Sequence, residues 1–215
     1  MNALSDTLRR LAQAAGPVAR FFSVGSDGEA TMSETGPGLP CRLLMFPNLR
    51  QAHSWDCGAT VAESVLQFYG FDVRGDETIK ALKTDRSGTD VGPIMKFLKA
   101  KGLKVWAGRA TLADVRACVD KGMPAILTIQ AYPDKPSEGW EDGWSNGHYV
   151  VAVGHTPQHI ILSDPSSVHD AYLLDTELDR RWHDNDAEGR IDHFMIVPYG
   201  KHQGFCWNKV LPLED

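Results

Sequence analysis

Cysteine is scarce in this chain and never occurs in a metal-binding or redox spacing. The 215 residues contain four cysteines, Cys41, Cys57, Cys118 and Cys206, and no CxxC motif. Thiols this few and this far apart do not suggest a disulfide framework, which favours a reducing compartment. The four histidines between residues 148 and 169 are not joined by cysteine or acidic residues at ligand spacing. We therefore expect no metal site.

An excess of basic charge, long apolar runs and phosphate-binding loops are also missing. The net charge is −6, so no basic excess is present to meet the phosphates of a nucleic acid. No stretch approaches the roughly 18 apolar residues of a membrane span, and the N-terminal residues lack the apolar core of a secretory signal. No GxxxxGKS/T loop occurs. We expect no nucleic-acid partner, no membrane span, no cofactor and, by default, a cytoplasmic location.

The patterning that is present predicts an α+β domain with additions at both ends. Residues 1–40 are predicted to form a helix, with Leu4, Leu8 and Leu11 on its apolar face, and then a connector rich in Gly, Ser, Thr and Pro. Residues 41–200 form the main domain, with helices first and strands later. Residues 201–215 form a C-terminal tail. Capping residues and periodicity predict further helices over 75–83, from Thr89 or Asp90 to Gly102, and over 112–121, and strands over 42–46, 103–106, 124–130 and 193–198.

Residues 51–69 carry the first candidate site. Apolar side chains recur at helical spacing after Cys57, and Gly70 follows as a stop, so Asp56 or Cys57 is the expected N-cap. The positive end of a helix dipole favours the thiolate, which is the nucleophilic form of cysteine. The Cys57 backbone N–H and the Gln51 side-chain amide are two donors that could form an oxyanion hole. Taken alone, a single cysteine such as Cys57 is more often a small buried core residue than a nucleophile.

A predicted β-hairpin carries the second candidate site. Apolar runs over 149–153 and 160–162 flank the turn-forming sequence GHTPQ. With residues 154–158 as the loop, Val153 lies opposite His159 and His148 lies directly opposite Asp164. Cross-strand partners share a face, so the carboxylate could orient the imidazole. A slip of one residue would put the two side chains on opposite faces.

Four further residues are assigned to substrate binding. Asp56 and Gly147 directly precede Cys57 and His148. Trp140 and Trp144 lie in a long loop between two predicted strands, and such loops are often functional. The alternative for the two tryptophans is that they dock on the core of the protein.

At these residues the chain resembles the papain-like cysteine peptidases, and among them the bacteriocin-processing, double-glycine-leader peptidase family. The resemblance rests on Gln51–AHSWD–Cys57–GAT, the turn SGTD at residues 87–90, GHYVVAVG from Gly147, and Asp164–Pro165, within residues 49–167. It implies a papain-like α+β fold with the helical part packed on an antiparallel sheet. By resemblance, Cys57 is the nucleophile, His148 the general base, Asp164 its orienting partner and Gln51 an oxyanion-hole donor. Members are often parts of ATP-driven exporters; because the features of an exporter are missing, cleavage after a Gly-Gly leader is not carried over.

Three functions remain compatible with these residues. The first is a cysteine peptidase or amidase that cleaves a peptide or amide bond through a Cys57 thioester, with a peptide or protein as substrate. The second is an acyl transferase or deamidase that uses the same triad. The third is a catalytically inactive, peptide-binding domain of the same fold that grips its ligand with the Trp140 and Trp144 loop.

Overall fold

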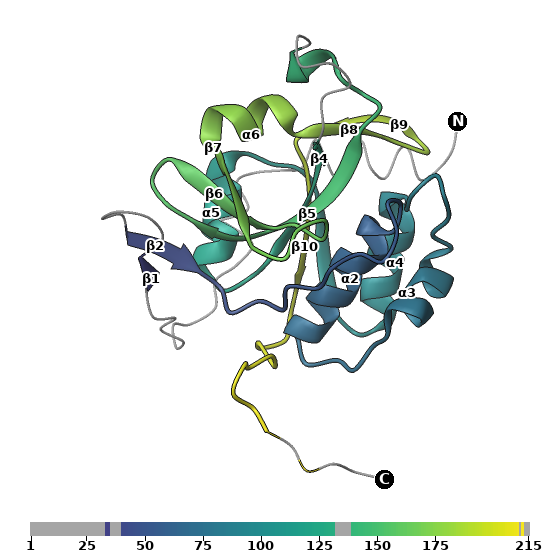
Figure 1. Cartoon of the computed structure of the whole chain (residues 1–215), viewed down its shortest axis with the longest axis vertical. Helices are drawn as coiled ribbons and strands as arrows, with labels where there is room; N and C mark the ends of the chain where they lie inside the picture. Colours follow the sequence, from purple (N-terminus) through teal and green to yellow (C-terminus); the bar gives the residue numbers. More distant parts are fainter. Residues whose placement is uncertain (1–32, 35–39, 132–138, 211, 213–215) are drawn as a thin grey trace.

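Three helices in the first half of the chain lie together on one side of an antiparallel sheet (Figure 1). The computed structural model describes residues 33–34, 40–131, 139–210 and 212. The three helices are α2 (Cys57–Phe68), α3 (Gly75–Leu82) and α4 (Val91–Ala100). This confirms the predicted α+β class with helices before strands. None of the described helices has the length and apolar character that crossing a membrane requires.

The sheet is organised around its longest strand, β5 (Gly147–His155). Its order is β1-β2-β5-β4-β10-β3, with β6 paired to β5 and β7 paired to β6, and every pairing is antiparallel. The other strands of this sheet are β1 (Ser33–Glu34), β2 (Pro40–Leu43), β3 (Lys104–Arg109), β4 (Ala125–Gln130), β6 (His159–Ser163), β7 (Ala171–Leu174) and β10 (Phe194–Tyr199).

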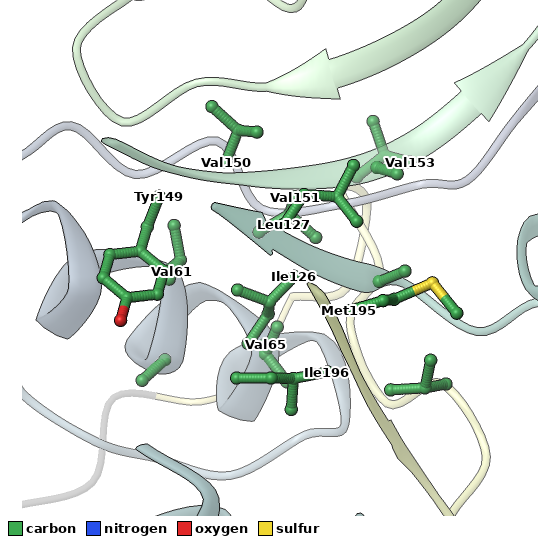
Figure 2. Packing of buried hydrophobic residues seen from close by; sticks show 14 of the residues in the cluster. Val61, Val65, Ile126, Leu127, Tyr149, Val150, Val151, Val153, Met195 and Ile196 are labelled. Atoms are coloured by element: carbon green, nitrogen blue, oxygen red, sulfur yellow. The ribbon is translucent and has the colours of Figure 1, made fainter. Parts of the chain in front are cut away.

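Apolar side chains of α2 and of the central strands form the core between the two layers. Figure 2 shows Val61 and Val65 of α2 beside Ile126 of β4 and Ile196 of β10. Each of these four side chains is at most 1% exposed. Because every residue of β4 is buried, this strand has neighbours on both faces. The core thereby fixes α2 against β5.

Helix α5 begins where the sequence predicts, whereas several helices and strands after it were not predicted from the sequence. Thr111 caps α5 (Leu112–Asp120) through a capping box with Asp114. The sequence patterns did not predict β7, the helix α6 (Asp175–Arg181) or the separate hairpin of β8 (His183–Asp186) and β9 (Gly189–Asp192). A single turn, η2 (Trp140–Asp142), interrupts the long loop before β5.

The β5–β6 register differs from the predicted one and contains a bulge. His155 pairs with Ile160 and Gly154 with Ile161, whereas Ala152 pairs with Leu162. The prediction that Val153 lies opposite His159 is therefore wrong, because the hairpin loop is shorter, at residues 156–158, and Val153 is an extra residue on β5. A side chain at Gly154 would have its Cβ 2.6 Å from the Arg42 carbonyl oxygen, so glycine lets β2 approach the bulge closely.

The described segments before and after the main domain both form hydrogen bonds with it. Residues 33–34 pair with residues 40–41, and β2 continues the sheet next to β5. The rest of the predicted N-terminal helix and connector lies outside the described residues. In the predicted tail, the backbone N–H groups of Gly204 and Phe205 donate to the Phe68 carbonyl oxygen at the end of α2. At least this part of the tail packs on the helix that begins with Cys57.

Candidate active site

Cys57 is the first residue of α2, and Asp56 is its N-cap. Helical hydrogen bonding starts with Thr60, whose N–H donates to the Asp56 carbonyl oxygen, so the Cys57 amide has no partner within the helix. The side chain is 8% exposed. The predicted position of this cysteine at a helix start is confirmed.

The loop before Cys57 is held by its own side chains. The Asp56 carboxylate is 2% exposed and accepts hydrogen bonds from the His53 backbone N–H at 3.0 Å and from the His53 ring at 3.1 Å. The Gln51 side-chain amide donates to the His53 carbonyl oxygen at 2.6 Å, which leaves its second N–H available. Asp56 thus supports the loop, and its contact with substrate stays a prediction.

His148 and Asp164 are joined directly. His148 Nε2 lies 2.7 Å from Asp164 Oδ1, and the same oxygen accepts hydrogen bonds from the Ser166 backbone N–H at 2.8 Å and the Ser166 hydroxyl at 2.7 Å. The Gln51 backbone N–H donates to the Pro165 carbonyl oxygen at 2.8 Å, so the loop before Cys57 is joined to the loop that carries Asp164. Two segments more than a hundred residues apart therefore meet at one point.

The bulge at Val153 places His148 and Asp164 on one face. The register of β5 with β6 before the bulge continues to put Asp164 opposite Val150 rather than opposite His148. The two residues are diagonal neighbours, two positions apart, and the direct opposition predicted from the sequence is wrong. Since residues at positions 148 and 150 share a face, the predicted hydrogen bond still forms.

His148 forms one hydrogen bond with Asp164 and another with Cys57, and both affect the pKa of its imidazole. Burial disfavours the imidazolium, but hydrogen bonds to Asp164 and to Cys57 outweigh it and raise the pKa of His148 to about 9. Burial also opposes the charge of Asp164, yet the hydrogen bond from His148 holds its pKa below the usual value. At neutral pH this arrangement is an imidazolium between a carboxylate and a sulfur.

The turn at residues 87–90 packs on the residue after Cys57. The Tyr149 hydroxyl donates to the Thr89 carbonyl oxygen at 2.8 Å. A Cβ on Gly58 would lie 2.8 Å from Thr89 Cβ and 3.1 Å from Tyr149 Cδ2. The SGTD turn therefore holds the start of α2 against β5, and only glycine fits between them.

We expect Gly58→Ala to destabilise the protein by about 1–3 kcal/mol, because the added methyl group has no space. Chemical denaturation measures this loss. The matched control is Gly92→Ala in α4, where a Cβ meets nothing within 4 Å, so that substitution should be neutral or stabilising. Equal stability of Gly58→Ala and Gly92→Ala would show that the contact with Thr89 does not constrain the helix start.

Strand β8 brings an acidic residue to this site that the sequence patterns did not single out. A Cβ on Gly147 would lie 2.2 Å from both carboxylate oxygens of Asp184, so this carboxylate rests against the residue before His148. Gln130, opposite Gly147 in the sheet, donates to Asp184 Oδ1 at 3.2 Å. The position of Asp184 depends on the packing of β8 beside β4, so no local sequence motif marks this residue.

Trp140 and Trp144 dock on neighbouring elements. The Arg181 guanidinium lies 3.5 Å from the centre of the Trp140 ring, and that of Arg190 lies 4.3 Å from the centre of the Trp144 ring. Trp144 also contacts the His183 ring, at 4.5 Å between centroids. These contacts support the docked alternative for both rings, and contact with substrate stays a prediction for them and for Gly147.

The model of the peptidase C39 family matches residues 45–186 of the chain. The peptidase domain of Streptococcus ComA, a bifunctional ABC transporter, is 21% identical, with 72% of this chain and 97% of that domain covered and a TM-score of 0.56. A double-glycine motif protease from an AMS/PCAT transporter, solved with a leader peptide, is 18% identical over 73% of this chain and 92% of its own, with a TM-score of 0.53. A Bacillus anthracis protein assigned as a C39-like peptidase is 15% identical over 75% and 98%, with a TM-score of 0.59. These similarities show the same fold; no curated protein matches the chain.

Proposed function

Because the chain belongs to the peptidase C39 family, we propose that it is a cysteine peptidase that hydrolyses a peptide bond through a thioester on Cys57. The observation that carries this proposal is the continuous contact from Cys57 through His148 to Asp164, with 2.7 Å between the imidazole and the carboxylate. A domain that only binds peptides has no need of this arrangement. The solved double-glycine protease holds a leader peptide, which makes a peptide the first substrate class to test here.

The reaction follows from the placement of these groups. An imidazolium beside a thiol stabilises the thiolate, and Cys57 Sγ attacks the carbonyl carbon of the substrate. The Cys57 backbone N–H and the remaining N–H of Gln51 stabilise the oxyanion. As the C–N bond breaks, His148 gives its proton to the leaving amine and the thioester remains. His148 then takes a proton from water, whose oxygen attacks the thioester carbonyl carbon. The C–S bond breaks, the acid product leaves, and the Cys57 thiolate is restored beside the imidazolium.

We expect iodoacetamide at pH 6 to modify Cys57 faster than the other cysteines, because His148 is protonated there and favours the thiolate. Mass spectrometry of tryptic peptides gives the site and rate. Cys206 is exposed and serves as the internal reference, whereas burial raises the pKa of Cys118 to about 12. The fast reaction should be lost in His148→Ala. If Cys57 reacts no faster than Cys206, the proposed thiolate–imidazolium pair is absent.

Peptide turnover then separates hydrolysis from transfer. A peptide library, including sequences with Gly-Gly, is incubated with the protein in H₂¹⁸O, and the products are analysed by mass spectrometry. Incorporation of ¹⁸O into a new C-terminal carboxylate identifies hydrolysis. A product joined to an added amine without ¹⁸O identifies transfer by the same thioester.

A further inference from the structure

The Asp184 side chain is anchored on one of its two oxygens. Its Oδ1 accepts hydrogen bonds from the Asn185 backbone N–H at 2.8 Å and from Gln130 Nε2 at 3.2 Å. Gln130 Nε2 also donates to the His183 carbonyl oxygen at 3.1 Å, and the whole residue is 1% exposed. The carboxylate is therefore held by the buried end of β4 rather than by a flexible surface contact.

The anchored carboxylate occupies the space above Gly147. Both of its oxygens lie 2.2 Å from the position that a Cβ of Gly147 would take. Gly147 is the first residue of β5, and His148 is the next. The side chain of Asp184 thus lies against the backbone that carries the proposed general base.

Charge connects Asp184 to the same residue. Burial raises the pKa of Asp184 to about 6, and the charge of Asp186 adds to this effect. The hydrogen bonds from the Asn185 N–H and from Gln130 act to lower this pKa, and so does the positive charge of His148. By the same interaction, the Asp184 carboxylate favours the charged form of His148. A carboxylate that loses its charge near pH 6 would change this support within the physiological range.

We propose that Asp184 is a positioning residue of the Cys57 site, which holds Gly147 in place and, as a second carboxylate beside Asp164, stabilises the imidazolium of His148. This inference rests on the proposed function, because it assigns a role toward the proposed base. This role also accounts for a second contact of β8. Asp186, two residues after Asp184, accepts a hydrogen bond from the Val91 N–H at the start of α4 at 2.9 Å. The β8–β9 hairpin thereby links the helical layer and the sheet beside the reacting thiol.

The pH dependence of the site reflects several neighbouring groups. His148 is faced by Cys57 from α2, by Asp164 from the segment after β6 and by Asp184 from β8. Asp184 is faced in addition by Asp186, which itself is near Asp90 and Glu188. Tyr149, next to His148, lies close enough to Cys57, Asp90, Asp184 and Asp186 to feel their charges. Of these acids, Asp164 acts on His148 through a hydrogen bond of 2.7 Å, and Asp184 acts on it through charge alone.

The test compares Asp184→Asn with wild type in the pH profile of Cys57 alkylation by iodoacetamide, which needs no substrate. Asparagine keeps Oδ1 for Gln130 and the packing on Gly147, but not the charge. The imidazolium should then deprotonate at a pH lower by about 0.5–1 unit, so the alkaline step of the profile, at which the thiolate loses its imidazolium partner, moves to lower pH by that amount. Glu188→Gln, which removes a charge from the exposed turn of the same hairpin, should leave the profile unchanged.

A double-mutant cycle tests the contact itself. Gly147→Ala should slow Cys57 alkylation in wild type and much less in an Asp184→Ala background, because the second change opens the space. A profile of Asp184→Asn equal to that of wild type, or additive effects in the cycle, would overturn the positioning role while Cys57 remains activated. Failure of the proposed function is recognised separately, as slow alkylation of Cys57 in the wild type.

Discussion

Cys57→Ala is expected to reduce peptide turnover by a factor of about 10⁴ or more, since loss of a nucleophile removes the thioester pathway altogether. The substitution removes one sulfur from a side chain that is 8% exposed, and the hydrogen bonds of the preceding loop do not involve that sulfur. The fold should therefore survive. Turnover is measured on the peptide that the library identifies, with circular dichroism to confirm folding.

The control for this substitution is Cys118→Ala. Cys118 lies in α5, is fully buried and packs in the same hydrophobic core, and the charges that act on its thiol are those of Asp114 and Lys121. The Cys118→Ala variant should lose some stability, because the substitution leaves a small cavity, and should keep most of its activity. If both variants lose activity equally while folded, Cys57 is not the nucleophile.

Asp164→Ala is expected to lower kcat/KM by about 10²–10⁴-fold, because the imidazole loses the acceptor that orients it. Asp164→Asn offers a sharper comparison, since its Oδ1 can still accept from His148 and from both donors of Ser166. We expect this variant to retain more activity than the alanine variant. Its pH profile should change, because removal of the negative charge lowers the pKa of His148 from about 9, and the alkaline limb then moves to lower pH.

The pair of variants separates orientation from charge. Steady-state rates are measured from pH 5 to 10 for the wild type and for both substitutions. Equal losses in Asp164→Asn and Asp164→Ala would mean that the charge, and not the hydrogen-bond geometry, carries the effect. An unchanged profile in both would contradict the role of Asp164 as the partner of His148.

Local signals in the sequence were sufficient to predict the parts of the site that depend on local structure. Capping residues and apolar spacing predict the helix start at Cys57 and the cap at Thr111, and the structure confirms both. The hairpin pattern predicts that His148 and Asp164 are joined, and they form a hydrogen bond. The exact register did not follow, because a bulge depends on how β2 approaches Gly154 from another part of the chain. The supporting place of Asp184 was not predicted for a similar reason. Its contacts with Gln130 and Gly147 join residues 37 to 54 positions apart.

The bulge at Val153 limits which insertions and deletions the β5–β6 hairpin can accept. Beyond the bulge, toward the turn, the strand partners have shifted by one position relative to those near His148. Removing or adding one residue elsewhere on the strand between His148 and Asp164, with the pairing kept continuous, would reverse the parity and turn the carboxylate to the other face. Changes in the three-residue turn leave this count intact as long as the flanking pairs are kept. Length variation in related chains should therefore be confined to that turn or come in compensating pairs.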